Sequence, residues 1–222
     1  NLPAVVDALS EANGFATASD MIATGGATLT NHVGTGSVAA ALAAQDYSHV
    51  VLQERGGDFV CGWGPMEACE NARTSLATLV RLAQEHEAVP ILLGTYQGSP
   101  ESSKAIEVAE SQAASEAGLD YVPVSERFRQ LRELHPEMTW FAPDDMHPGS
   151  DLTLLEAILL FERIHGVRPG SSALVVSAPI YESMSYVPPE VRAAGAPIEQ
   201  LDVPSSAQYE SARIVAVLES LK

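Results

Sequence analysis

The stretch His49-Val50-Val51-Leu52-Gln53 decides the fold. A short apolar run rich in β-branched residues is typical of a strand buried inside a parallel sheet. A second run of this kind, Val89-Pro90-Ile91-Leu92-Leu93-Gly94, follows after a long amphipathic segment at 66–87. Strand, helix and strand in this order predict a parallel β–α–β unit.

The rest of the chain extends this alternation. We expect further helices at 2–13, 38–45, 102–118, 126–134 and 152–165, and further strands at 15–24 and 121–124. Ser37 is the expected N-cap of the helix at 38–45, and Gly118 and Gly166 are expected to end the helices before them. The sequence therefore predicts an α/β fold, a three-layer α/β/α sandwich around a parallel, flavodoxin-like sheet, with residues 1–222 as a single domain.

The segment at 171–201 departs from the alternation. It begins with the β-prone run Ala173-Leu174-Val175-Val176 and continues with several prolines. We expect an irregular insertion or a hairpin arm here. A closing helix is expected at 205–221, with Ser205 or Ser206 as its N-cap.

Charge restricts the partners of this protein. The 29 acidic residues outnumber the 12 basic ones and give a formal net charge of −17. Such a field repels phosphate backbones and anionic lipid, so neither nucleic acid nor a membrane surface is expected as a partner. No apolar run reaches the roughly 18 to 20 residues that a membrane span requires.

Two cysteines, Cys61 and Cys69, lie close together around Gly62 and Gly64. This spacing favours a small disulfide loop, and two reduced thiols are the alternative. A disulfide favours a secreted or periplasmic location, with the cytoplasm as the alternative. No metal site is expected, because two thiols without a neighbouring third ligand are too few.

The loop Pro143-Asp144-Asp145-Met146-His147-Pro148 holds the most informative chemistry. An imidazole acts as general base toward a serine hydroxyl when a carboxylate orients its other ring nitrogen. Three residues of separation in a tight loop can bring Asp144 against His147. The alternative is a solvated loop whose aspartate caps the following helix.

The run from Trp140 to Ser150, with the apolar helix at 152–161 and His165-Gly166-Val167-Arg168-Pro169 after it, resembles the last sequence block of SGNH (GDSL-like) hydrolases. The closest likeness is to a bacterial subgroup with a D-x-x-H-P loop. The resemblance implies that His147 is the base and Asp144 its orienting carboxylate.

Three other segments resemble earlier blocks of this family in the same order. Leu2-Pro3 resembles the start of the helix after the nucleophile turn, and Gly25-Gly26-Ala27-Thr28-Leu29 resembles the glycine block of the oxyanion hole. Val50-Val51-Leu52-Gln53-Glu54 resembles the third block, which implies that the Gln53 amide is an oxyanion donor. The alternatives are a simple turn at Gly25-Gly26 and a Gln53 that satisfies a backbone group.

The family places its nucleophilic serine a few residues before the Leu-Pro pair. The resemblance therefore implies that the first strand of the sheet and the serine lie just upstream of Asn1, so that the sequence is a fragment of a longer chain. Ser37 follows Gly34-Thr35-Gly36 and is an alternative nucleophile, although it lacks a preceding strand.

Three residues near the expected site are candidate substrate contacts: Arg55, Tyr96 and Trp63. Arg55 could instead pair with Glu54 on the rim, and Tyr96 could simply cover the sheet. Trp140, before the His147 loop, is expected in the core.

The resemblance implies a serine-dependent hydrolase of short acyl esters, such as acetyl groups on a carbohydrate, without metal or cofactor. A non-catalytic binding or structural domain on the same fold, lacking the serine, is the alternative. A flavodoxin-like ligand-binding domain is disfavoured, since the sequence contains no G-x-G-x-x-G or P-loop motif.

Overall fold

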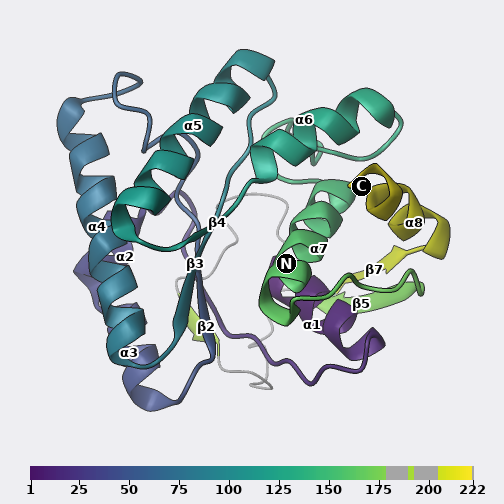
Figure 1. The fold of residues 1–222 in the computed structure, drawn as a ribbon, viewed down its shortest axis with the longest axis horizontal. Helices are drawn as coiled ribbons and strands as arrows, with labels where there is room; N and C mark the ends of the chain where they lie inside the picture. The colour runs from purple at the N-terminus through teal and green to yellow at the C-terminus, as the bar shows by residue number, and fades with distance from the viewer. Residues whose placement is uncertain (179–189, 193–204, 222) are drawn as a thin grey trace. The chain divides into compact units, whose positions relative to one another are not determined.

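The computed structural model describes residues 1–178, 190–192 and 205–221 (Figure 1). The contacts of the chain divide it into two compact units. The first unit is Asn1–Gly25 with Gln130–Lys222, and the second unit is Gly26–Arg129.

The second unit contains the parallel sheet that the two apolar runs predict. Its strands are β2 (His49–Leu52), β3 (Val89–Leu93) and β4 (Asp120–Val122), in the order β2-β3-β4. Both pairs are parallel, with Val51 opposite Ile91 and Leu92 opposite Tyr121. The prediction of an α/β fold with a parallel sheet is thus confirmed at this level, with three strands in the described sheet.

The helices of the second unit are α2 (Leu29–Thr35), α3 (Ser37–Ala44), α4 (Met66–Glu85), α5 (Pro100–Ala117) and the first part of α6 (Val124–Leu134). Sequence reasoning missed α2, although Thr28 and Asn31 form a capping box at its start. The prediction of Ser37 as an N-cap is wrong. Gly36 holds that position in left-handed conformation and provides no side-chain cap to α3.

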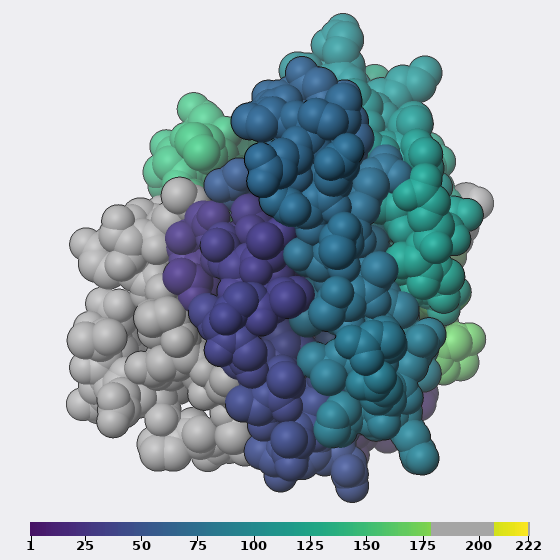
Figure 2. All heavy atoms as spheres, turned by 90° about the vertical axis from the view of Figure 1, so that its left-hand side faces the viewer, coloured from purple at the N-terminus to yellow at the C-terminus, as the bar shows by residue number. Residues whose placement is uncertain are grey.

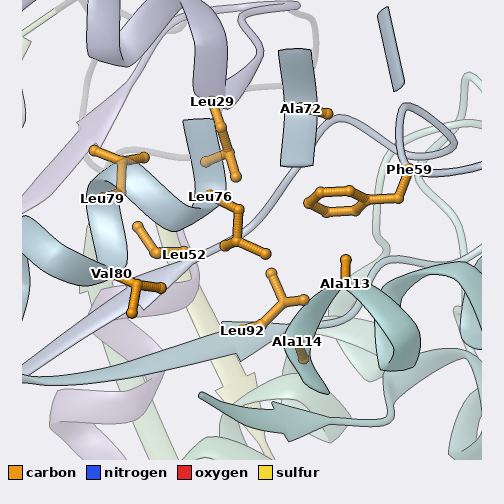
Figure 3. Packing of buried hydrophobic residues seen from close by; sticks show 10 residues of the cluster. All are labelled: Leu29, Leu52, Phe59, Ala72, Leu76, Leu79, Val80, Leu92, Ala113 and Ala114. Atoms are coloured by element: carbon orange, nitrogen blue, oxygen red, sulfur yellow. The ribbon is translucent and has the colours of Figure 1, made fainter. Parts of the chain in front are cut away.

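The core of the second unit lies between its helices and one face of the sheet (Figure 3). Leu76, Leu79 and Val80 of α4 are at helical spacing, and they meet Leu52 and Leu92 from the strands. Burying one leucine stabilises a fold by roughly 2 kcal/mol, so this cluster holds α4 on the sheet. Figure 2 shows α4 on the surface between the α2–α3 segment and α5.

The first unit is built around α7. Its elements are α1 (Leu2–Ala12), β1 (Met21–Ala23), α7 (Ser150–His165), β5 (Leu174–Ala178), β6 (Glu190–Arg192), β7 (Ser205–Tyr209) and α8 (Ser211–Ser220). Strand β1 pairs antiparallel with β6, and β5 pairs antiparallel with β7. Most apolar residues of α7 are buried, and α7 packs on α1, which also contacts β5.

The closing helix predicted at 205–221 is wrong at its start. Residues 205–209 form a strand instead, because they pair along their whole length with β5. Helix α8 begins at Ser211 after Glu210, which provides no side-chain cap, so the prediction of Ser205 or Ser206 as the cap is also wrong. Of the arm predicted at 171–201, residues 179–189 and 193–201 lie outside the described residues.

The predicted disulfide between Cys61 and Cys69 is confirmed, with the two Cα atoms 5.2 Å apart. It joins the loop that follows β2 to the first turn of α4 in the second unit. For a loop of this length, the chain-entropy relation gives a stabilisation of about 2.5 kcal/mol. The bridge therefore fixes the segment that contains Trp63.

Candidate functional site

The loop that contains His147 is closed on itself by backbone hydrogen bonds. Phe141 and Pro148 form an isolated antiparallel bridge. The Ala142 N–H donates to the His147 carbonyl at 2.9 Å, and the Asp145 N–H donates to the Ala142 carbonyl at 3.0 Å. These bonds give the loop one defined shape, so the spacing of its side chains is set by the backbone.

Asp144 receives hydrogen bonds from within this loop. Its Oδ1 accepts from the N–H groups of Met146 at 3.0 Å and His147 at 2.9 Å. Its Oδ2 lies 2.5 Å from Nδ1 of His147. The bond from the His147 ring, and then those from the two backbone amides, lower the pKa of Asp144 to about 2. Asp144 is therefore ionised across the neutral range.

This contact decides which nitrogen of His147 carries the proton. An ionised carboxylate can only accept, so Nδ1 must be the donor and Nε2 of the neutral ring is left with a lone pair. Nε2 has no partner among the residues that the structure describes. The side chain is 33% exposed, so an incoming hydroxyl can reach it. The pair thus has the local geometry of a general base with its orienting carboxylate.

The other predicted site residues follow β2 and β3 in the second unit. The Gln53 side-chain amide donates to the Gly94 carbonyl at 3.3 Å. Gly94 follows β3 directly, and a Cβ there would lie 2.8 Å from the Val122 carbonyl oxygen, so the backbone is tightly packed. The amide of Gln53 is accordingly anchored at the carboxyl edge of the sheet, where ligands bind in α/β folds.

The alternative role for Arg55, an ion pair with Glu54 on the rim, is wrong. The guanidinium of Arg55 pairs with Asp58 at 2.9 Å, and its Nη1 reaches the Gly26 carbonyl at 3.4 Å. Glu54 is buried instead and accepts from the backbone N–H groups of Leu29 at 3.1 Å and Arg55 at 2.8 Å. Packing at the end of β2 thus buries Glu54 and leaves the Arg55 side chain on the surface.

A second buried carboxylate, Glu110 of α5, lies at the end of β3. It accepts from the Thr95 N–H at 3.0 Å, the Thr95 hydroxyl at 2.6 Å and the Tyr121 hydroxyl at 3.1 Å. Burial raises the pKa of Glu110 to about 7 against the effect of these bonds, and burial likewise raises the pKa of Glu54 to about 7. Sequence reasoning missed both groups, because periodicity does not reveal which acidic residue is enclosed.

These two carboxyls predict a pH dependence of stability. The folded chain holds protons that the unfolded chain releases from about pH 4.5 upward, so stability falls as pH rises from about 4.5 to 7. We expect each carboxyl group to account for a loss of about 2 to 3 kcal/mol in the free energy of unfolding over this pH range. Urea unfolding of wild type, Glu54→Gln and Glu110→Gln at pH 5 and 8 measures this. Each variant should lose less stability than wild type between these pH values; equal losses would contradict the assignment.

Tyr96 and Trp63 have different surroundings. Tyr96 packs edge to face on the buried ring of Phe128, with centroids 6.1 Å apart. Trp63 is 49% exposed and its ring lies against Gly57, where an added Cβ would come within 2.9 Å of it. Of the two, only Trp63 presents a large exposed apolar surface, while Tyr96 is half-buried against the core.

The predicted site residues are divided between the two units. Asp144, His147 and Gly25 belong to the first unit. Gly26, Gln53, Arg55, Tyr96 and Trp63 belong to the second. Within each unit the structure brings together Asp144 with His147, and Arg55 with Gly26.

A serine–histidine–glutamate arrangement that sequence reasoning missed lies in the first unit. His135 Nε2 is 3.0 Å from the Ser220 hydroxyl, and His135 Nδ1 is 3.4 Å from Glu137. The Ser220 hydroxyl donates to the Ala216 carbonyl at 2.9 Å, so it accepts from His135 and is not activated by it. Ser220 is also the last residue of α8, where the carbonyls oppose an oxyanion. This arrangement is a poor nucleophile site.

Neither a metal centre nor a membrane span is found in the part of the chain that the structure describes. No three His, Cys, Asp or Glu side chains there are grouped so that they could hold an ion. No described helix combines the length and the apolar character needed to cross a bilayer.

Comparison with models of protein families and with curated proteins finds no match for this chain.

Proposed function

We propose that this protein is an SGNH-type hydrolase of short acyl esters. The observation that supports this most directly is the 2.5 Å contact between Asp144 and His147 Nδ1, which leaves Nε2 with a lone pair and no partner among the described residues. That arrangement is what a base needs in order to activate a hydroxyl nucleophile.

In the proposed reaction, Nε2 of His147 accepts the hydroxyl proton of a serine as its oxygen attacks the ester carbonyl. The protonated ring then donates this proton to the departing alcohol. Water attacks the acyl-enzyme in the second half, again with His147 as base. Asp144 stays ionised and stabilises the charged imidazole. The serine belongs to the proposal and is expected before Asn1, together with a strand that joins the parallel sheet to give the three-layer SGNH architecture.

The oxyanion would be bound by the N–H of Gly25 or Gly26 and by the side-chain amide of Gln53. Donors aimed at a charge that appears only in the transition state are each worth about 3 kcal/mol. Gln53 is held at the end of β2 by its bond to the Gly94 carbonyl. This anchoring supports a preorganised donor, since the amide has little freedom to turn away.

The substrate that we propose is a neutral short ester, such as an acetyl group on a carbohydrate, with Arg55, Tyr96 and Trp63 as contacts. A formal charge of −17 disfavours polyanionic substrates. An exposed tryptophan such as Trp63 offers the flat apolar face on which a sugar ring stacks. We also propose a secreted or periplasmic location, which the disulfide supports.

Reaction of the intact protein with a fluorophosphonate probe tests the proposal. We expect one serine before Asn1 to be labelled in the native protein and not after denaturation. Ser220→Ala is the matched control, because it removes the one described serine hydroxyl that lies in a Ser–His–Glu arrangement. The proposal fails if no serine reacts, and this result would favour a non-catalytic domain on the same fold.

A further inference from the structure

Glu54 places a carboxyl group in the interior, where a glutamate is rarely found. It is 4% exposed, and its neighbour Arg55 directs its guanidinium to Asp58. The recorded partners of its carboxylate among the described residues are the backbone N–H groups of Leu29 and Arg55. Burying a carboxyl group that has no salt bridge among the described residues lowers the stability of the fold. A functional role of Glu54 would explain why the chain keeps it there.

The bonds of Glu54 join two segments that are distant in sequence. Leu29 is the first residue of α2 and follows the turn that begins at Gly26, while Glu54 follows Gln53 at the end of β2. Arg55 adds a second link between the same segments through the Gly26 carbonyl, at 3.4 Å. The turn at 26–29 is thus fastened to the strand end at 53–55 by both a buried and an exposed bond.

We infer that Glu54 is a positioning residue, which fixes the turn at 26–29 against the strand end that bears Gln53 and so sets the separation of the two oxyanion donors. This inference rests on the proposed function. The two donors come from different segments of the second unit, the Gly26 N–H from the turn and the Gln53 amide from the strand end. Their spacing therefore depends on what ties these segments together.

The protonation state of Glu54 is coupled to the hydrogen bond that joins it to the start of α2. Burial raises the pKa of Glu54 to about 7, the bonds from Arg55 and Leu29 lower it, and the charges of Asp58 and Arg55 oppose each other. If the turn opens, the carboxyl enters water and regains its ordinary acidity. Opening therefore becomes easier as pH rises from about 4.5 to 7.

Steady-state hydrolysis of p-nitrophenyl acetate at pH 8 by the intact protein tests the inference. Glu54→Gln keeps the shape but turns an NH₂ group toward one backbone N–H. We expect kcat to fall about tenfold with little change in KM, because the donors act on the transition state. Ser75→Ala is the matched control, since it removes a different bond to α2, that from Ser75 to the Thr30 hydroxyl at 3.0 Å. It should leave kcat within about twofold.

Hydrogen exchange of the Leu29 amide gives a second readout, which reports directly on the bond between Glu54 and the start of α2. Corrected for intrinsic rates, opening should rise about a hundredfold from pH 5 to 8 in wild type and stay level in Glu54→Gln. An active wild type with equal kcat in Glu54→Gln and Ser75→Ala, or with identical exchange profiles in wild type and Glu54→Gln, overturns the inference and leaves the proposed function standing. An inactive wild type overturns the proposed function, and the positioning role of Glu54 with it.

Discussion

Replacing His147 by alanine is expected to lower kcat/KM for p-nitrophenyl acetate about 10⁴-fold in the intact protein. The variant loses the only described imidazole that is paired with an ionised carboxylate at 2.5 Å and has a ring nitrogen without a described partner. Without that base the serine must react as a neutral hydroxyl. Residual activity from the oxyanion donors would account for what is left.

Two further variants make this test specific. Asp144→Asn should lose about 10³-fold or more, because an amide in place of the carboxylate favours the wrong tautomer of His147. His135→Ala is the matched control, since His135 also contacts a serine and a glutamate but is expected to have no part in the reaction. Equal rates in His147→Ala and wild type would remove His147 from the mechanism. A loss confined to His135→Ala would move the site to Ser220.

The parts of the fold that the sequence predicts well are those encoded locally. The runs at 49–53 and 89–94 become β2 and β3, because a short apolar run between polar turns is too short for a buried helix and favours a buried strand. Gly118 and Gly166 adopt the left-handed conformation after α5 and α7, as expected of helix-ending glycines. The contact of Asp144 with His147 is also local, since both residues lie in one closed loop.

The parts that sequence reasoning missed depend on distant partners. Residues 205–209 become a strand because they pair with the edge of β5, which lies about thirty residues earlier in the chain. No local sequence pattern indicates such a pairing. Glu54 resembles any other acidic residue beside an arginine, and only the packing of α2 on the strand end buries it. The guanidinium of Arg55 pairs with Asp58, while the buried Glu54 carboxylate accepts from the backbone N–H groups of Leu29 and Arg55.

Gly149 is a position in the His147 loop where close contact with the segment at 139–141 requires a glycine. Its φ of −76° suits any residue, so backbone conformation does not explain the glycine. The reason is space: a Cβ there would lie 2.3 Å from the Thr139 carbonyl oxygen and 2.8 Å from that of Phe141. Both are backbone atoms, and the Gly149 N–H is itself bonded to the Trp140 carbonyl at 2.9 Å. A side chain at position 149 could therefore be accommodated only by moving the backbone of 139–141.

Gly149→Ala is therefore expected to lower the free energy of unfolding of the first unit by about 3 kcal/mol. Displacing the segment at 139–141 also moves the bridge from Phe141 to Pro148, which closes the loop around Asp144 and His147. Hydrolysis should fall about a hundredfold as the base shifts. Urea unfolding followed by the fluorescence of the buried Trp140, in a Trp63→Phe background, measures the loss of stability.

Gly64→Ala is the matched control for this variant, because a Cβ at Gly64 meets no atom within 4 Å and its φ lies outside the left-handed region. Its stability should stay within about 0.5 kcal/mol of the parent. If Gly149→Ala were equally mild, the chain at 139–141 would have to be free to move away. In that case the hydrogen bonds that close the loop could not fix the positions of Asp144 and His147, and the base would not be preorganised.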